Sequence, residues 1–327
     1  MIISRTPLRI SFMGGGSDLP AFYEQEPGCV ISTAIDKYIY ININRKFDNS
    51  IRASYSVTEI VDRLGDLKHE LIRESLRLTG VQEGIEITSI SDIPSAGTGM
   101  GSSSSYTVGL LNALYAYQGL HAGAERLAQE ACRIEIDICR KPIGKQDQYI
   151  AAYGGLQCIR FNPGGNVFVD PIVCKLETRL ELERRLLLFY TGITRSANPI
   201  LEEQRSNTSN NVQTRNTLRS MSQLALAMRG SLYANGLDNI GEMLHESWLL
   251  KKSLASTITN DRIDGWYERA RKCGACGGKL LGAGGGGFLL LYAHPECHNA
   301  IISALAELPH IPFRFEPQGS KIVYVEE

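Results

Sequence analysis

The hydrophobic residues of this chain follow two different periods, and the order of these periods predicts the fold class. Alternating or β-rich stretches predict strands, whereas apolar residues at helical spacing predict helices. In the first half, strands are expected at residues 2–12, 29–35, 38–44, 85–91 and 155–161, and helices at 57–79, 103–118, 124–140 and 144–153. Because strands and helices do not alternate regularly, the pattern favours an α+β fold over a doubly wound α/β sheet.

The second half begins with a short apolar strand at residues 186–190 and is then mainly helical. Helices are expected at 195–205, 212–234, 240–254, 261–272 and 296–305, and further strands at 278–281, 288–292 and 321–325. The charged segment 175–185 precedes the apolar strand and has the composition of a connection. We therefore expect two domains, residues 1–183 and 184–327.

Composition and charge narrow the class of partners. The chain has 327 residues, 43% of them hydrophobic, which is enough for a sizeable core. A formal net charge of −1 gives no general attraction to nucleic acid or to an anionic membrane, so any anion site must be local. No stretch reaches the apolar length of a membrane span, and the eight cysteines lack the spacing of a zinc site. A cytoplasmic protein with small-molecule partners is expected.

A run of glycines and serines at residues 94–105 carries the clearest chemical signal. Glycine lets a ligand approach the bare backbone, and the first N–H groups of the helix that follows lack intrahelical partners and attract anions. One serine is enough to cap a helix, so four serines in a row leave at least one hydroxyl free for a phosphate or for Mg²⁺. The expected phosphate ligands are Gly97, Gly99, Gly101, Ser102, Ser103 and Ser104.

Other glycine-rich stretches do not match the common nucleotide motifs. Neither Gly144-Lys145-Gln146 nor Gly278-Lys279-Leu280 continues with the serine or threonine of a Walker loop. The run 282–287 satisfies G-x-G-x-x-G, but a strand follows it where the dinucleotide fingerprint requires a helix. Its six small residues exceed what a hairpin needs, so we expect a large group, a triphosphate, to approach this backbone.

Two further segments carry candidate chemistry. Arg9 lies on an expected strand ahead of a glycine turn and Asp18, although a surface arginine and a turn aspartate explain these residues equally well. Asp147 has a glutamine on each side and apolar residues nearby, which indicates a partly enclosed position.

Taken together, these segments resemble the GHMP kinase superfamily, named for galactokinase, homoserine kinase, mevalonate kinase and phosphomevalonate kinase. Its three motifs correspond here to Pro7-Leu8-Arg9, to the phosphate loop at 94–104 and to the glycine-rich loop at 281–288, in the family's order. The resemblance spans nearly the whole chain. It implies a two-domain GHMP kinase fold, with a ribosomal-protein-S5-domain-2-like N-terminal domain and a ferredoxin-like α/β sandwich at the C-terminus.

The same resemblance implies roles for individual residues. It places the catalytic aspartate at Asp147 and the basic residue of the first motif at Arg9, which we expect beside Asp147, stabilising developing negative charge. It also implies ATP and Mg²⁺, with the metal held by Ser103, or its neighbour Ser102, and by Glu135.

For the acceptor, the resemblance implies that Asp18 binds the sugar. Galactokinases carry Gly-Glu-His-x-Asp at this point, and the glycines and serine found here argue against galactose. Arg195 is the expected partner of a phosphate on the substrate, although a surface arginine at a helix start is nearly as good an explanation. The expected substrate-binding residues are Asp18, Gly15, Gly16, Ser17, Arg195 and Gly285.

The implied activity is ATP-dependent phosphorylation of the anomeric hydroxyl of a sugar phosphate. In residues 13–18, 144–149 and 190–197 the chain resembles the members of the family that act on a heptose 7-phosphate. That resemblance implies the 1,7-bisphosphate as product, for nucleotide-activated heptose and surface polysaccharide. Another sugar 1-kinase of fucokinase or uronic-acid-kinase type, a decarboxylase of the same fold and a non-catalytic sugar sensor stay as alternatives. The expected partners are ATP and the sugar phosphate, with no nucleic acid or membrane, and the expected state is a monomer or homodimer.

Overall fold

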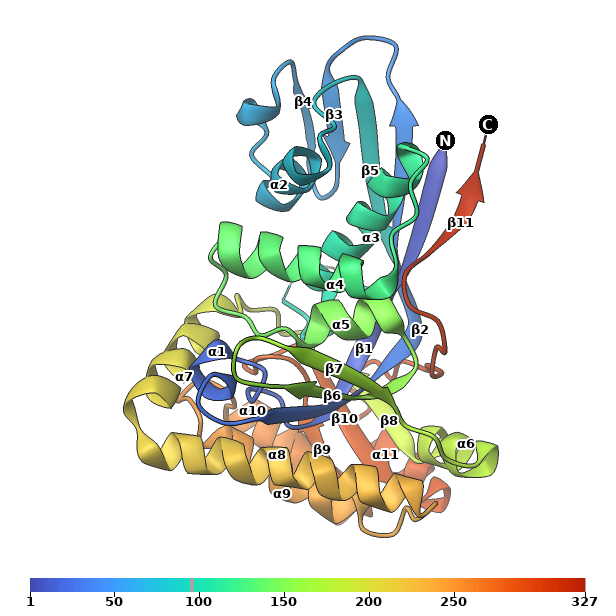
Figure 1. The fold of residues 1–327 in the computed structure, drawn as a ribbon. Coiled ribbons are helices and arrows are strands. Elements are labelled where there is room, and N and C mark those ends of the chain that lie inside the picture. Colours follow the sequence, from blue (N-terminus) through green and yellow to red (C-terminus); the bar gives the residue numbers. More distant parts are fainter. Residues whose placement is uncertain (95–96, 327) are drawn as a thin grey trace.

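The computed structural model describes residues 1–94 and 97–326, which form two β-sheets with helices packed around them (Figure 1). The predicted α+β class is confirmed. The larger sheet contains eight strands: β1 (Ile2–Met13), β2 (Gly28–Arg45), β3 (Ile51–Ser54), β4 (Thr58–Val61), β5 (Ile85–Ser91), β6 (Leu156–Phe161), β7 (Val167–Pro171) and β11 (Lys321–Val325). The smaller sheet contains β8 (Leu186–Tyr190), β9 (Ala275–Leu280) and β10 (Phe288–Ala293).

The long strand β2 organises the larger sheet. The strand order is β11-β1-β2-β5-β3-β4; β2 pairs with β6 through its first part and with β5 through its second, and β7 pairs with β6. All pairs are antiparallel except β3 with β5. Residues 28–35 of β2 are buried on both faces, whereas its later residues alternate, so one face there meets solvent.

Helices cover the sheets on several sides. The α-helices are α1 (Pro20–Tyr23), α2 (Glu70–Thr79), α3 (Ser102–Tyr117), α4 (Ala124–Cys132), α5 (Gln146–Tyr153), α6 (Leu176–Arg184), α7 (Asn198–Asn210), α8 (Val212–Tyr233), α9 (Ile240–Lys252), α10 (Asp261–Lys272) and α11 (His298–Ala304). Shorter helical turns are η1 (Leu64–Asp66), η2 (Arg133–Ile138) and η3 (Pro295–Cys297), of which η2 is a π-helix. Among the helices of the described residues, none is long and apolar enough to cross a bilayer.

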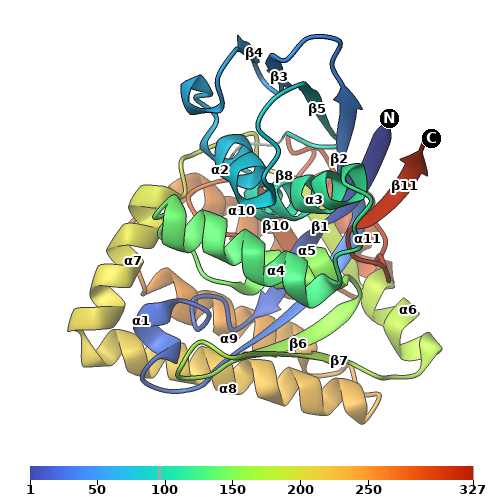
Figure 2. The same ribbon diagram turned by 45° about the horizontal axis from the view of Figure 1, so that its top comes forward.

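Packing around β1 and β2 places the phosphate loop at the centre of the molecule. Helices α3 and α5 pack on these strands from one side and α8 from the other, as Figures 1 and 2 both show. Helices α9 and α10 cover β9 of the smaller sheet, where Trp248 and Tyr267 are among the largest buried side chains. Both sheets therefore contribute residues to the space between them.

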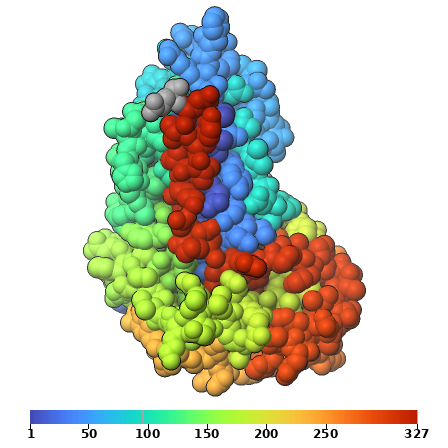
Figure 3. Space-filling view, turned by 90° about the vertical axis from the view of Figure 1, so that its right-hand side faces the viewer, coloured from blue at the N-terminus to red at the C-terminus, as the bar shows by residue number. Residues whose placement is uncertain are grey.

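The end of the chain returns to the first sheet. The backbone of Glu316 donates to Ala34 O at 2.9 Å and accepts from the N–H of Gly155, and β11 then pairs with β1. In Figure 3 this terminal stretch runs along the face of the N-terminal region. The last strand thus lies with the first expected domain, and the boundary between residues 183 and 184 otherwise stays a prediction.

Several sequence predictions of local structure are wrong in an instructive way. The single helix expected at 57–79 is instead β4, η1 and α2, because 58–61 pair with β3 as an edge strand. The two strands expected at 29–35 and 38–44 form one strand with a bulge opposite Pro7, which has no N–H to donate to the ladder. Segment 175–185, expected to be a connection, forms α6, and β3 and β7 were not predicted.

Candidate active site

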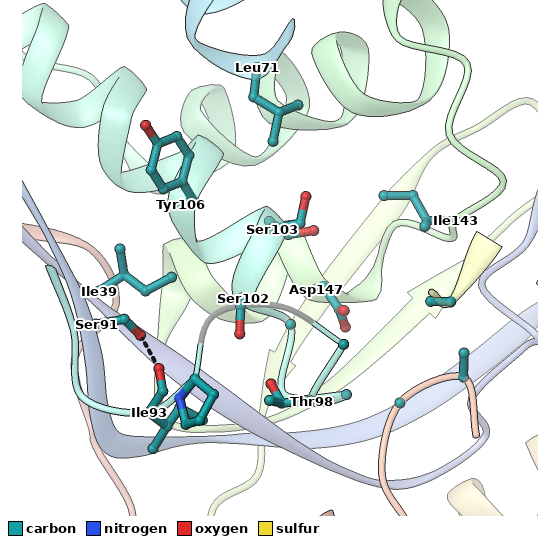
Figure 4. Close-up of a pocket in the computed structure, with 18 of the residues that line it drawn as sticks. Ile39, Leu71, Ser91, Ile93, Thr98, Ser102, Ser103, Tyr106, Ile143 and Asp147 are labelled. Atoms are coloured by element: carbon teal, nitrogen blue, oxygen red, sulfur yellow. Dashed lines mark hydrogen bonds between the residues drawn. The ribbon is translucent and has the colours of Figure 1, made fainter. Parts of the chain in front are cut away.

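The serine-rich loop forms one wall of a cavity of about 1010 Å³. Helix α3 begins at Ser102, and Gly101 before it supplies no side-chain cap, so the first N–H groups of the helix are free for an anion. The hydroxyls of Thr98 and Ser102 are buried, have no hydrogen-bond partner among residues 1–94 and 97–326, and belong to residues that line the cavity (Figure 4). Residues 95 and 96 of the expected motif lie outside the described residues. The described part of the loop fits a bound phosphate.

The glycines of this loop serve the packing of the chain on itself. Gly97 and Gly99 have φ of +67° and +74°, and a Cβ there would lie 2.6 Å from the carbonyl oxygen of Arg195 and 2.5 Å from that of Leu281. The packing of the chain therefore explains why these two residues are glycines, while their role as phosphate ligands stays a prediction; both line the large cavity. Gly101 is also left-handed, with φ of +75°, and faces the side chains of the site.

The C-terminal glycine-rich loop requires a similar correction. A Cβ on Gly282 would lie 2.3 Å from Gly99 Cα, and one on Gly287 would lie 2.2 Å from Thr98 O. Gly286 similarly faces the backbone of Ile193. The rest of the chain, including residues 97–99, thus approaches this backbone closely and accounts for these glycines. The approach of a triphosphate stays a prediction, and residues 282–284 and 286 do line the large cavity.

Arg9 and Asp147 form the central ion pair of the site. Arg9 lies on β1 and Asp147 in the first turn of α5, and the guanidinium donates to the two carboxylate oxygens at 2.7 and 2.6 Å. The Arg9 backbone N–H also donates to Met100 O at 3.2 Å. Strand β11 pairs only with residues 2–5 of β1, so the edge of β1 at Arg9 is free to bind the serine-rich loop. The expected proximity of Arg9 and Asp147 is confirmed.

Glu135 presents a buried carboxylate behind the first serines of α3. The Ser103 hydroxyl donates to Oε1 at 2.5 Å and the Gln148 amide donates to Oε2 at 2.7 Å. Glu135 lies in the π-helical η2, a type of turn that is frequent at functional sites. Burial raises the pKa of this carboxyl, and a bound cation would offset that penalty.

The donor set around Glu135 fits a magnesium ion that arrives with nucleotide phosphates. Mg²⁺ prefers oxygen ligands and is commonly bound through one or two carboxylates together with phosphate oxygens and water. Within residues 1–94 and 97–326 there is no group of three or more His, Cys, Asp or Glu side chains that could hold a metal alone. Glu135 and the serine hydroxyls of α3 are the oxygens available here.

A second, smaller pocket of about 90 Å³ meets the large cavity at Arg9 and Asp147, which line both. It is the candidate acceptor pocket. Its other polar or glycine residues are Ser11, Gly15, Gly16, Asp18, Gly144, Gln146, Gln204, Lys251, Lys279 and Gly282.

Asp18 is buried in the acceptor pocket and is fixed by backbone donors. Its carboxylate accepts from the N–H of Gly16 at 2.9 Å and from that of Gln146 at 3.3 Å. Burial raises the pKa of Asp18, and the nearby charge of Asp147 adds to the effect. A Cβ on Gly144 would lie 2.0 Å from Asp18 Oδ2, which explains the glycine at that position.

The remaining expected acceptor ligands divide between the two cavities and the interior. Gly15 and Gly16 line the acceptor pocket, whereas the buried Ser17 hydroxyl donates to Gly14 O at 2.7 Å and accepts from Cys29 N–H, which stabilises the loop. Gly285 packs against Arg195 and Ile200 and lines neither cavity. Of the expected acceptor ligands, Asp18, Gly15 and Gly16 thus line the acceptor pocket, whereas Ser17 and Gly285 line neither cavity.

The cations of the site differ from those expected. Arg195 is exposed and lines the large cavity, beside the phosphate loop, together with Lys141. The acceptor pocket instead contains Lys251 and Lys279, which sequence reasoning missed. The one available signal was a lysine next to the apolar residues at the end of the expected strand 278–281, which is part of β9 in the structure.

Comparison with known proteins identifies the family. The model for the GHMP kinases N terminal domain matches residues 66–155, and that for the GHMP kinases C terminal domain matches residues 228–310. A D-glycero-alpha-D-manno-heptose 7-phosphate kinase from Campylobacter jejuni is 30% identical over 98% of each chain. The chain belongs to the GHMP kinases.

Further comparisons give a relative in sequence, named a fucokinase, and a crystal structure with the same fold. A bifunctional fucokinase/GDP-fucose pyrophosphorylase from Arabidopsis thaliana is 27% identical over 88% of this chain and 29% of its own. The crystal structure of a D-glycero-D-manno-heptose 1-phosphate kinase from Bacteroides thetaiotaomicron superposes with a TM-score of 0.81, at 23% identity, over 100% of both chains. The expected enzyme class, a GHMP-type sugar kinase with ATP as a substrate, is confirmed.

Proposed function

We propose that this GHMP kinase transfers the γ-phosphoryl group of ATP to the anomeric hydroxyl of D-glycero-D-manno-heptose 7-phosphate, which gives the 1,7-bisphosphate. The observation that carries the proposal is the junction of the two cavities. The phosphate loop lines one, the acceptor pocket is the other, and Arg9 and Asp147 line both. A phosphoryl donor and a hydroxyl acceptor can therefore meet at the ion pair.

Phosphoryl transfer depends mainly on positioning and charge neutralisation, and the ion pair supplies both. We assign Asp147 as the group that accepts the proton from the anomeric hydroxyl, because its carboxylate faces the acceptor pocket. Arg9 fixes that carboxylate and stabilises the negative charge on the transferring group. Asp18 is placed to accept hydrogen bonds from sugar hydroxyls.

Magnesium is part of the proposal because the oxygens of Glu135 and Ser103 suit it. When bound, the ion would neutralise charge on the phosphates of ATP. Glu135 and Ser103, or Ser102 with its unpartnered hydroxyl, would hold it. Lys141 and Arg195 line the same cavity and add positive charge near the phosphates.

The far part of the large cavity suits the adenine ring. Ile39, Leu71, Ile93 and Tyr106 line it with apolar surface, and the Ser91 hydroxyl donates to Ile93 O at 2.8 Å (Figure 4). We assign this region to the base, with the triphosphate directed toward the start of α3.

The choice of a heptose phosphate rests on two supports. The first is the relative from Campylobacter jejuni, whose name gives a heptose 7-phosphate kinase. The second is the loop 14–18, which lacks the Glu-His of galactokinases. A role in making nucleotide-activated heptose for surface polysaccharide, a cytoplasmic location and a monomeric or homodimeric state follow as predictions.

The proposal is tested by ADP release against an acceptor panel. The panel contains heptose 7-phosphate, unphosphorylated heptose, fucose, glucuronate and mevalonate 5-diphosphate, each with MgATP. We expect heptose 7-phosphate to have the highest kcat/KM and the product to show a second, anomeric phosphate by ³¹P NMR. Preference for fucose or glucuronate would move the enzyme to another sugar 1-kinase class, and carbon dioxide release from the mevalonate compound would identify a decarboxylase. Binding without turnover of any acceptor would indicate a sensor.

A further inference from the structure

Two buried lysines converge on the acceptor pocket from the smaller sheet and its helix. Lys251 comes from α9 and Lys279 from β9, and they are 6% and 2% exposed. Lys279 Nζ donates to Phe12 O at 3.0 Å, and Lys251 Nζ donates to Gly282 O and, at 3.4 Å, to Leu280 O. Within the described residues, these ammonium groups have carbonyl partners and form no ion pair with a carboxylate.

The fixed charges of the pocket leave an excess of positive charge. Its cations are Arg9, Lys251 and Lys279, and its carboxylates are Asp18 and Asp147. Asp147 is occupied by the guanidinium of Arg9, and the Asp18 carboxylate accepts from two backbone N–H groups. With all five groups ionised, the walls of the pocket carry one net positive charge.

Burying two ammonium groups so close together is unfavourable unless an anion joins them. Burial lowers the pKa of Lys251 to about 7 and that of Lys279 well below its usual range, and the neighbouring cations add to both effects. An anion in contact with both would offset desolvation and mutual repulsion at once. Phosphate, with three acceptor oxygens, matches ammonium groups that still have N–H donors left, since Lys279 uses one on a carbonyl and Lys251 uses two.

We propose that Lys251 and Lys279 form the subsite that binds the phosphate group of the acceptor, in place of the exposed Arg195. This inference deepens the proposed function and rests on it, because it requires a phosphorylated sugar as the acceptor. Arg195 lines the nucleotide cavity and is absent from the walls of the acceptor pocket. The two lysines therefore determine specificity for a phosphorylated over an unphosphorylated sugar.

A purely structural role would produce a different kinetic pattern. Lys251 also holds the glycine-rich loop through Gly282 O, and Lys279 ties β9 to β1 through Phe12 O. Loss of these bonds would affect all acceptors, and ATP, alike. Loss of an anion subsite affects the phosphorylated acceptor selectively.

The experiment compares kcat/KM for heptose 7-phosphate and for unphosphorylated heptose in four proteins. These are the wild type, Lys251→Met, Lys279→Met and the control Lys252→Met, whose side chain lies next in sequence but pairs with Asp264. Methionine keeps the volume and removes the buried charge, which proteins often tolerate well; thermal unfolding checks the fold. We expect the preference for the phosphorylated sugar to fall about 10- to 100-fold in each site variant, with KM for ATP unchanged. Lys252→Met should keep the wild-type preference.

Equal losses for both sugars, or a loss confined to ATP, would overturn the subsite. So would an Arg195→Met variant that loses the preference while the lysine variants keep it. If the wild type uses neither sugar, the proposed function fails, and the subsite is judged separately by titration calorimetry of inorganic phosphate with ADP saturating. In that case Lys251→Met and Lys279→Met should weaken phosphate binding at least about tenfold, and unchanged binding would contradict the inference.

Discussion

The nucleotide half and the acceptor half of this site are built in opposite ways. In the proposed nucleotide half, the part that would bind the phosphates is one continuous segment, residues 97–104, supported by Glu135 from η2. The acceptor half draws on β1, the loop after it, α5, α7, α9 and β9, which are distant in sequence. Its cations are buried, whereas the nucleotide half offers the exposed Arg195, the half-buried Lys141 and uncapped helix N–H groups.

This difference has a physical origin. A phosphate chain common to all nucleotides can be bound by backbone donors, so a local motif is enough. An acceptor must be distinguished from similar molecules. Buried polar side chains do this most strongly, because an analogue that lacks the matching group leaves them without a partner. Tertiary packing has to bring such side chains together. Variants that affect one half and spare the other therefore test how separate the halves are.

The largest effect is expected where the halves meet. Asp147→Asn removes the proton acceptor and leaves the buried Arg9 guanidinium without its charged partner. General base catalysis contributes roughly 10²- to 10⁴-fold, so we expect kcat to fall about 10³-fold with modest changes in both KM values. Single-turnover ADP release measures the chemical step directly.

The exposed Asp137 is the matched control, and Asp137→Asn should retain wild-type turnover. Near wild-type turnover of a folded Asp147→Asn protein would show that Asp147 only orients the hydroxyl. A change confined to one KM would instead assign the residue to one half.

A smaller effect, limited to the nucleotide half, is expected for Glu135→Gln. This change keeps the shape but removes the charge beside Ser103, and one of the two bonds to the carboxylate loses its acceptor. We expect kcat/KM for ATP to fall about 10²-fold and the Mg²⁺ concentration for half-maximal rate to rise, since magnesium depends on carboxylate oxygens. Titration of Mg²⁺ at fixed ATP measures this. An unchanged Mg²⁺ dependence, or an equal loss for the acceptor, would make Glu135 a structural carboxylate.

The difference between a local motif and residues gathered by tertiary packing also explains which site residues could be predicted from the sequence. The phosphate loop, Arg9, Asp18, Glu135 and Asp147 lie in compact motifs, and the structure brings all of them to the two cavities or directly behind them. Lys251 has no local signal, because it follows two leucines at the end of an ordinary helix.

The glycine runs show the other limit of the sequence. Gly99 and Gly282 look like ligand-binding glycines, yet each makes room for the other's backbone. Composition reveals that something approaches closely, but only the fold shows that it is the chain itself. The strand at residues 58–61 could not be predicted for the same reason. An edge strand forms because it pairs with its neighbour, here β3, more than because of its own sequence pattern.

The smallest effect is a pH dependence that should belong to the acceptor half alone. Arg9, Asp18, Asp147 and Lys279 surround Lys251, and burial lowers the pKa of Lys251 from its ordinary value near 10.5 to about 7. Below this pKa the ammonium is charged and attracts a phosphate; above it the charge is lost. The kcat/KM for heptose 7-phosphate should therefore decline about tenfold between pH 7 and 9, since kcat/KM reports groups of the free enzyme.

Two comparisons isolate the origin of this decline. It should be absent from kcat/KM for unphosphorylated heptose and from the Lys251→Met variant, which starts at the low value and stays there. A decline shared by ATP would mean that Lys251 acts on the transferring phosphoryl group, which in the proposed function would lie at Arg9 and Asp147, where the two cavities meet. The charge of Lys251 would then act on both halves of the site, and other residues of the acceptor pocket would have to provide the specificity for a phosphorylated acceptor.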